Sequence, residues 1–417
     1  MRRYCDGYLT PFEYLGGMYL NREQEAMLEG EMGEGKMLAM KLLVNIGDVV
    51  GAPHLIPISS AHISGVSYRT GGDGLVETLR EFVSRGAAVS VHSTLNPCGL
   101  DIMQGAYFAA TPEFVEKQRE IVDLYRRMGV KPTLSCIPYR DDNIPGFGEH
   151  ISWAESNAVV FANSVLGART NKEGSISALC AAIAGYTPYF GLHILENRLP
   201  RLEVKVNWKV TIWESQVLGA YIGSRFGTQV PLFNMDLRFS VKRLNRMGAA
   251  LAAFGDGAIL HVKDATPEAV RKLPRFEEAI EERTVVERKE VEEFTASVSE
   301  GLEGASTIVI GCPHLDFEEL KELYKEMRGR RVRADVRLLL FTNRVFFQLA
   351  KESGIVNKLK EAGVEVYTDT CMVVSSLPDE GGLYLTDSLK AYFYMSRLSS
   401  KEVRASPLMS ILNFAME

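Results

Sequence analysis

Four stretches of the chain repeat one pattern: an amphipathic segment, a glycine, a short apolar run rich in β-branched residues, and a polar tip. They cover residues 83–97, 125–136, 302–312 and 359–371. A glycine after a helical segment is typical of a left-handed C-cap, and an unbroken apolar run of this length is typical of a buried parallel strand. The pattern therefore predicts an α/β fold with mostly parallel sheets flanked by helices, whose polar tips gather at one edge.

The 417 residues exceed the size at which a single hydrophobic core keeps growing, so we expect several lobes. Residues 1–17 lack helical or strand periodicity, and we interpret them as an N-terminal extension or a mis-assigned start. The rest divides, at approximate boundaries, into an α/β lobe at 18–200, a middle lobe at 201–300 and an α/β lobe at 301–417.

Local patterns predict individual elements within these lobes. Asn21 is a suitable N-cap for a helix expected over 20–43. Residues 306–374 form the clearest succession of helices and strands, and 383–398 add a strand followed by a helix. The pattern over 211–253 mixes apolar residues with glycine and aromatics and does not predict an order of elements.

Three of the six cysteines, Cys136, Cys312 and Cys371, directly follow predicted strands. Ligands of open α/β sheets bind beyond the carboxyl ends of the strands, so these thiols could meet at one point. Three thiolates are one short of the set that saturates an iron–sulfur cube, and they would leave one iron open to a substrate hydroxyl. The plainer interpretation is that each cysteine is a buried apolar side chain, because no CxxC or CxxH pair is present.

A polar segment at 149–174 is dense in Glu, Ser, Asn, Arg and Thr around a short apolar helix pattern. That density fits neither a core nor an ordinary solvated surface. Together with STLNPCG at 93–99, GCPH at 311–314 and TDTC at 368–371, the segment resembles the aconitase X family. The resemblance extends from about Met18 to the C-terminus and depends on several separated motifs.

This resemblance implies a multi-lobed, aconitase-like subunit with a [4Fe-4S] cluster on Cys136, Cys312 and Cys371. It also implies a hydro-lyase. Archaeal members of the family dehydrate (R)-5-phosphomevalonate to trans-anhydromevalonate 5-phosphate in a modified mevalonate pathway of isoprenoid biosynthesis, whereas bacterial relatives act on cis-3-hydroxyproline. We expect this chain to lack the swivelling domain of aconitase-like sites. A separate small subunit would supply that domain and the general base.

The resemblance also implies which residues bind the substrate: Gly65, Val66, Ser67, Asn96, Pro97, Glu155, Ser156 and Lys390. Glu155 is in addition the catalytic candidate of this chain, as a carboxylate that accepts a hydrogen bond from a hydroxyl. Its alternative role is a helix-start carboxylate favoured by the helix dipole. Lys390 would bind a substrate carboxylate or phosphate as a point charge, or would simply be solvated on a final helix.

The remaining cysteines are weaker candidates. Cys98 follows an Asn-Pro pair that recurs in the family while the residue after it varies, so it ranks fourth as a cluster ligand. Cys5 lies in the aperiodic N-terminal segment and Cys180 in an apolar helix pattern. We expect both to have no part in the site.

Composition narrows the class of partner. A net charge of −6 disfavours nucleic acid, and no apolar run reaches the length of a membrane span. Six cysteines without a dense framework favour a reducing compartment, so we expect a cytoplasmic protein. The family resemblance implies that its ligand is a small phosphorylated hydroxy acid. Two other classes stay open: an iron–sulfur sensor that binds RNA through a basic face, and a metabolite-binding subunit without metal.

Overall fold

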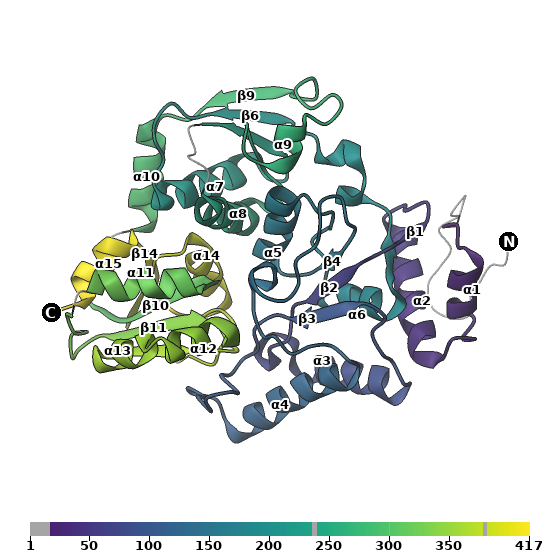
Figure 1. Cartoon of the computed structure of the whole chain (residues 1–417), viewed down its shortest axis with the longest axis horizontal. Coiled ribbons are helices and arrows are strands. Elements are labelled where there is room, and N and C mark those ends of the chain that lie inside the picture. Colours follow the sequence, from purple (N-terminus) through teal and green to yellow (C-terminus); the bar gives the residue numbers. More distant parts are fainter. Residues whose placement is uncertain (1–16, 236–239, 300, 328, 378–381) are drawn as a thin grey trace.

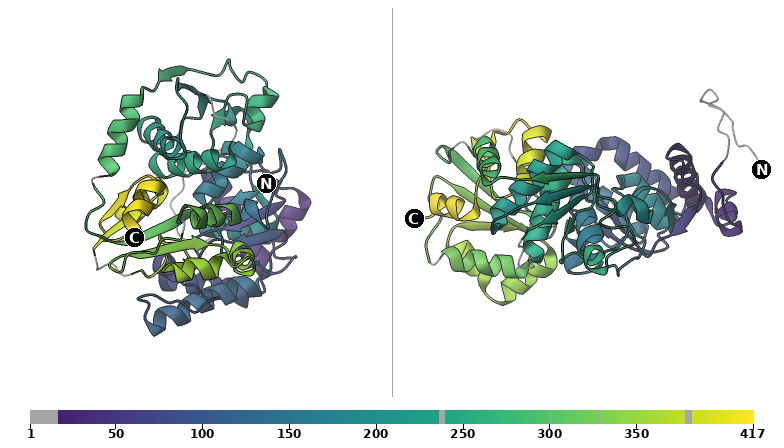
Figure 2. Two further views of the ribbon diagram at one scale, coloured as in Figure 1. Left: turned by 60° about the vertical axis from the view of Figure 1, so that its left-hand side comes forward. Right: turned by 90° about the horizontal axis from the view of Figure 1, so that it is seen from above.

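The computed structural model describes residues 17–235, 240–299, 301–327, 329–377 and 382–417. We call residues 17–200 the N-terminal part, 201–299 the middle part and 301–417 the C-terminal part. Figure 1 shows the middle part beside both of the others. The view from above in Figure 2 places the N-terminal helices and the C-terminus at opposite ends of the molecule.

The N-terminal part is built on a parallel sheet of order β3-β2-β4, next to a short antiparallel pair of β1 and β5. Helix α6 packs on β2 and α2 packs on α6, while α3 and α4 pack against each other. α6 has the sequence SISALCAAIA and is apolar almost all round, which is typical of a helix enclosed by other elements. The elements are α1 (Arg22–Leu28), α2 (Glu34–Val49), β1 (Leu55–Pro57), β2 (Ser60–Ile63), α3 (Tyr68–Ser84), β3 (His92–Leu95), α4 (Pro112–Arg127), β4 (Ser152–Trp153), α5 (Ser156–Phe161), α6 (Ser175–Ala184) and β5 (Tyr186–Pro188).

The expectation of a single helix over 20–43 is wrong in one respect. Asn21 does cap a helix, since its side chain accepts a hydrogen bond from the Gln24 backbone N–H at 2.9 Å. The helix ends at Leu28, however, and α2 starts only at Glu34. Gly30 and Gly33 between them have φ values of +87° and +99°, which an α-helix does not contain.

The middle part has a parallel sheet of order β8-β7-β6-β9, covered by the closely packed pair α7 and α8. Glycines make this close approach possible. A Cβ added at Gly219 would lie 2.2 Å from the Met247 carbonyl oxygen, and one at Gly223 would lie 2.9 Å from that of Leu251. The elements are β6 (Leu202–Lys205), α7 (Ile212–Phe226), β7 (Pro231–Asn234), α8 (Val241–Gly255), β8 (His261–Val262), α9 (Pro267–Arg271), β9 (Glu282–Val285) and α10 (Arg288–Val298).

The C-terminal part is an all-parallel sheet of order β12-β11-β10-β13-β14. β10 is central and reads ASTIVIGCPHL, an almost wholly buried strand with neighbours on both sides. The predicted strand and helix over 383–398 are present as β13 and α14. The elements are β10 (Ala305–Leu315), α11 (Phe317–Met327), β11 (Arg337–Thr342), α12 (Arg344–Glu352), α13 (Ile355–Glu361), β12 (Val364–Tyr367), β13 (Leu383–Thr386), α14 (Leu389–Leu398), β14 (Val403–Ala405) and α15 (Leu408–Ala415).

The predicted fold class is confirmed: mostly parallel sheets flanked by helices, repeated along the chain. Among the helices of the described residues, none is long and apolar enough to span a membrane. Each of the three parts has a large apolar cluster, and that of the middle part also includes Val160 of the N-terminal part and Leu389 and Ala405 of the C-terminal part.

Candidate active site

The three candidate cysteines come from two parts of the molecule, and two of their predicted strand contexts are wrong. Cys136 follows an extended segment rather than a strand: Pro132 has no N–H to donate and Leu134 has a φ of +49°, which interrupts strand geometry. Cys312 lies inside β10, after the point where the strand's register shifts beyond Ile310. Cys371 lies in the loop after β12, as predicted.

These thiols share one region of the interior. Burial raises the pKa of all three, that of Cys371 to about 12. Negative charge on Glu155, Cys312 or Cys371 would raise the pKa of Cys136 further, whereas Lys390 lowers it. Thiolate charge on Cys312 would likewise raise the pKa of Cys371. Such effects act over short distances, so the five groups are neighbours.

The described residues contain no group of three or more His, Cys, Asp or Glu side chains arranged around one metal ion. A cube of four irons has a different requirement, because each cysteine binds a different iron and the thiols surround the cluster instead of sharing one ion. The donor chemistry fits. The His314 backbone N–H donates to Cys136 Sγ at 3.2 Å, and the ammonium of Lys390 offsets part of the rise that burial causes in the pKa of Cys136 and Cys312.

Cys98 and Cys180 have other surroundings. The Cys98 thiol donates to the Leu100 carbonyl oxygen at 3.1 Å and is fully buried in the core of the N-terminal part. Burial alone raises the pKa of Cys180, which sits within α6 in the same core. Neither is among the charges that perturb the three candidate thiols. Cys5 lies outside the described residues.

Glu155 and Lys390 form an ion pair beside these thiols, and their side chains are only 12% and 8% exposed. Glu155 is the N-cap of α5 and Lys390 lies in the first turn of α14, so the pair joins the N-terminal and C-terminal parts. Lys390 Nζ also donates to Asn157 Oδ1 at 2.6 Å, and Asn96 Nδ2 donates to Glu155 Oε2 at 2.7 Å. The hydroxyl of Ser156 donates to the other Glu155 oxygen at 3.4 Å.

The pair is ionised at neutral pH. Burial by itself would raise the pKa of Glu155, but the charge and hydrogen bond of Lys390 and the hydrogen bond from Asn96 lower it below its ordinary value. Burial would lower the pKa of Lys390, but Glu155 and the neighbouring thiols raise it overall. The two directions agree, and each group keeps the other charged.

His62 orients the amide of Asn96. Its Nδ1 lies 2.8 Å from Thr94 Oγ1 and its Nε2 lies 3.4 Å from Asn96 Oδ1. Burial lowers the pKa of His62 to about 4, so the ring is neutral at neutral pH. A neutral ring that donates from Nε2 to the amide oxygen keeps the Asn96 nitrogen turned toward Glu155.

The loop with Gly65, Val66 and Ser67 lies against the loop that carries Cys371. The Ser67 hydroxyl donates to the Val374 carbonyl oxygen at 2.9 Å and also caps α3 by accepting from the Arg69 N–H. Gly65 has a φ of +71°, and a Cβ there would lie 2.8 Å from Ser175 Cβ. Only glycine fits this turn without strain.

The Asn96–Pro97 segment is held against the same loop from the other side. The backbone N–H of Cys98, the residue after Pro97, donates to the Asp369 carbonyl oxygen at 2.8 Å. Asp369 is in turn paired with Arg344 and buried. All eight predicted substrate-binding residues are thus in, or next to, segments that surround Cys371 and the Glu155–Lys390 pair.

Arg246 is a site neighbour that the sequence analysis missed. It lies on α8 in the middle part, is 4% exposed, and donates from Nη1 to the Cys312 carbonyl oxygen at 3.2 Å. Its Nη2 lies 3.4 Å from both Glu319 and Asp387. The signal that could have revealed it is a basic residue within the apolar stretch of α8, since a buried arginine needs acidic partners.

Fold and site together define a multi-part α/β protein in which loops from separate sheets converge on thiols and a buried ion pair. Comparisons with known proteins identify this class. Family models match three consecutive segments: the aconitase X first domain at residues 17–196, the second domain at 200–296 and the third domain at 305–417. The chain therefore belongs to the aconitase X family, as its motifs predicted. Such an aconitase-like family implies an iron–sulfur cluster in general.

Individual relatives are similar over most of their length. The chain is 40% identical, over 381 residues, to the phosphomevalonate dehydratase large subunit of Thermococcus kodakarensis, covering 90% of this chain and 95% of the relative. It is 38% identical to that of Methanosarcina mazei, covering 91% and 92%. The crystal structure of Thermococcus kodakaraensis aconitase X in its holo-form matches with a TM-score of 0.86 at 39% identity, over 95% of this chain and all of that one.

Proposed function

We propose that this chain is the large subunit of a hydro-lyase that dehydrates (R)-5-phosphomevalonate to trans-anhydromevalonate 5-phosphate. The observation that carries the proposal is the convergence of three thiols on the ionised Glu155–Lys390 pair. The names of relatives at 35–40% identity supply the substrate. The second candidate function is dehydration of cis-3-hydroxy-L-proline. It is suggested by cis-3-hydroxy-L-proline dehydratases from Hypocrea jecorina and Pseudomonas aeruginosa, which are 34% and 31% identical to this chain.

We assign Cys136, Cys312 and Cys371 as the ligands of a [4Fe-4S] cluster. Held by three cysteines, such a cluster supplies a Lewis-acidic iron for the departure of a hydroxyl. Cys136 and Cys312 are buried and Cys371 is half-buried, so little bulk water reaches these thiols. This favours the assignment, because exclusion of water strengthens the electrostatic effects that such chemistry needs.

In this proposal Lys390 binds an anionic oxygen of the substrate. An ammonium has three N–H donors, and Glu155 and Asn157 use two of them, which leaves one for the ligand. Glu155 stays ionised and accepts a hydrogen bond from the substrate hydroxyl, while Asn96 and Ser156 keep its carboxylate in place. The loop with Gly65, Val66 and Ser67 offers backbone N–H groups to the other end of the substrate.

We further propose that a separate small subunit with the swivelling domain closes the site and supplies the general base. The words "large subunit" in the relatives' names support a partner of this kind. We also propose that the chain divides into lobes at residues 18–200, 201–300 and 301–417. We propose in addition that the protein is cytoplasmic. Each of these lobes would have its own parallel sheet.

The test is an anaerobic assay of the full chain, reconstituted with iron and sulfide and mixed with its small subunit. Water loss from (R)-5-phosphomevalonate and from cis-3-hydroxy-L-proline is followed by NMR in parallel samples, with the large subunit alone as a control. Turnover of the phosphorylated substrate only, dependent on both subunits and on iron, is expected. Turnover of hydroxyproline instead would replace the substrate assignment, and a colourless, iron-free protein would overturn the cluster assignment.

A further inference from the structure

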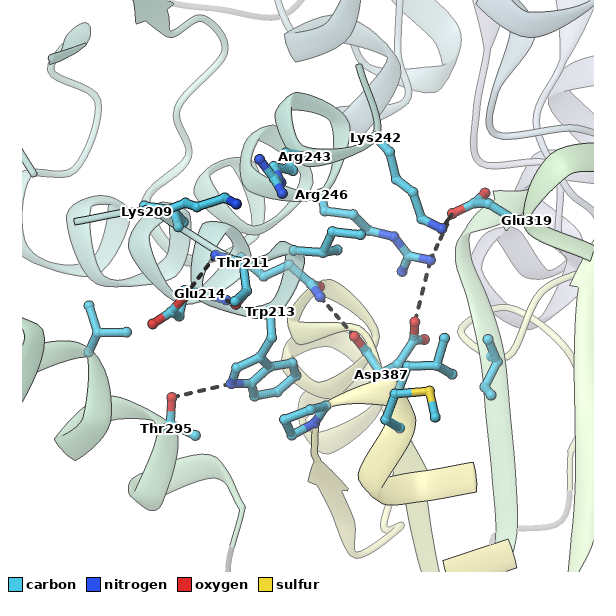
Figure 3. Close-up of a pocket in the computed structure, with 18 of the residues that line it drawn as sticks. Lys209, Thr211, Trp213, Glu214, Lys242, Arg243, Arg246, Thr295, Glu319 and Asp387 are labelled. Atoms are coloured by element: carbon cyan, nitrogen blue, oxygen red, sulfur yellow. Dashed lines mark hydrogen bonds and ion pairs between the residues drawn. The ribbon is translucent and has the colours of Figure 1, made fainter. Parts of the chain in front are cut away.

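A cavity of about 950 Å³ lies between the middle part and the C-terminal part (Figure 3). Its walls come from the start of α7, from α8 and α10 on one side, and from β10, α11 and the start of α15 on the other. None of the eight predicted substrate-binding residues and none of the three candidate cysteines lines it. The cavity is therefore distinct from the candidate active site, and Arg246, which donates to the Cys312 carbonyl oxygen, lies between the two.

Most charges around the cavity are paired. Its lining contains five basic and four acidic residues. Arg288 lies 3.5 Å from Glu214 and 3.6 Å from Glu292, while Arg246 and Lys242 share Glu319. These pairs use all the acidic residues of the lining, since the remaining one, Asp387, also pairs with Arg246.

Two basic groups are left over. Across the described ranges, neither Lys209 nor Arg243 has an ion-pair partner, and Arg243 Nε is buried without a hydrogen-bond partner. In Figure 3 Lys209 extends from the segment before α7 and Arg243 extends from α8, on the same wall of the cavity. A buried donor without a partner costs free energy, so a ligand that accepts a hydrogen bond there would be favoured. Two positive charges match one dianionic group.

Apolar residues of the lining come from both walls, Ile212 and Trp213 from the start of α7 and Leu408 and Met409 from the start of α15. Ile212 and Met409 are large apolar residues of the lining that stay 37% and 43% exposed. Leu408 and Trp213 line the cavity with them, and the Trp213 indole N–H is already bonded to Thr295 Oγ1 at 3.3 Å. With its polar edge satisfied, the Trp213 ring is available for apolar contact.

We propose that this cavity is a second binding site, for a phosphate ester with a short apolar carbon chain. The phosphate lies at Lys209 and Arg243, and the carbon chain lies against Trp213, Leu408 and Met409. Inorganic phosphate can bind the two basic groups but has no carbon chain for the apolar residues. An uncharged alcohol has the carbon chain but no phosphate for the basic groups. The site is distinct from the one proposed above, because no candidate cysteine or predicted substrate-binding residue lines the cavity. Arg246 alone belongs to its lining and also contacts the Cys312 carbonyl oxygen.

The experiment titrates the full chain with n-pentyl phosphate by calorimetry, and with inorganic phosphate and n-pentanol as comparison probes. The expected result is saturable binding of n-pentyl phosphate that is tighter than binding of either comparison probe. Arg243→Gln and Lys209→Gln should each weaken it about tenfold or more, as expected for loss of a hydrogen bond to a charged group. Quenching of Trp213 fluorescence, absent in Trp213→Phe, locates the ligand.

Two variants serve as controls. Arg225→Gln removes an exposed arginine of the same part, on α7 but outside the cavity, and should leave the dissociation constant unchanged. Lys390→Ala reports whether the probe binds at the candidate active site instead. Any of three results would overturn the proposal. The first is no binding of n-pentyl phosphate at millimolar concentration. The others are an affinity in Arg243→Gln and Lys209→Gln equal to that of the parent chain, and loss of binding in Lys390→Ala alone.

Discussion

Replacing Lys390 by methionine tests the central electrostatic argument, because it leaves the Glu155 carboxylate buried without its cation. The side chain of Glu155 is 12% exposed in the pair, so solvent reaches it only slightly. Breaking a buried ion pair from one side costs about 3–5 kcal/mol, and we take about 3 kcal/mol for this slightly exposed carboxylate. Methionine keeps a similar apolar stem, so packing changes little.

The melting temperature of the full chain measures this cost. With an unfolding entropy of roughly 2.1 cal/mol/K per residue over 417 residues, a loss of about 3 kcal/mol lowers the melting temperature by about 3–4 °C. Lys263→Met, at an exposed lysine, is the matched control and should lower it by less than about 1 °C. Glu155→Gln combined with Lys390→Met removes both charges and should recover more than half of the loss.

The pH dependence gives an independent check. The folded-state pKa of Glu155 is depressed below its ordinary value of 4.5, so its contribution is present above that pH and is lost as the pH falls through the folded value. In Lys390→Met, burial without the ammonium raises the pKa of Glu155, and the variant regains relative stability when the carboxylate is protonated. The gap in melting temperature should therefore narrow between pH 7 and about pH 4. A constant gap, or a Lys390→Met shift no larger than that of Lys263→Met, would refute the reasoning.

Two further predictions concern the cluster and the substrate loop. Serine in place of Cys136, Cys312 or Cys371 should remove most of the iron from the reconstituted chain, as measured by iron content and visible absorbance. Cys98→Ser and Cys180→Ser should keep the iron. Full iron retention by all three variants at the candidate positions would exclude those cysteines as ligands. Gly65→Ala should lower the melting temperature more than Gly86→Ala, since both glycines have positive φ but only the Cβ at Gly65 meets a neighbour, Ser175 at 2.8 Å. Equal shifts would show that the contact has no effect beyond backbone strain.

The sequence alone determined the fold class, because helix and strand periodicities are local properties of the chain. The β-branched run that became β10 and the Asn21 cap were both readable from neighbouring residues. Separated motifs were also sufficient to predict the aconitase X family. Errors arose where local backbone geometry overrode the pattern, as at Gly30 and Gly33, which divide a predicted helix, and at Leu134, which interrupts a predicted strand.

Only the tertiary structure decided which polar residues pair with one another. Lys390 and Glu155 are 235 positions apart, and no periodicity connects them. The buried contact of Arg246 with the Cys312 carbonyl oxygen and the two uncompensated charges at Lys209 and Arg243 were equally invisible in the sequence. The physical reason is that ionisation, burial and hydrogen bonding depend on distances across the packed interior, and these distances are set by how the sheets and their loops pack together.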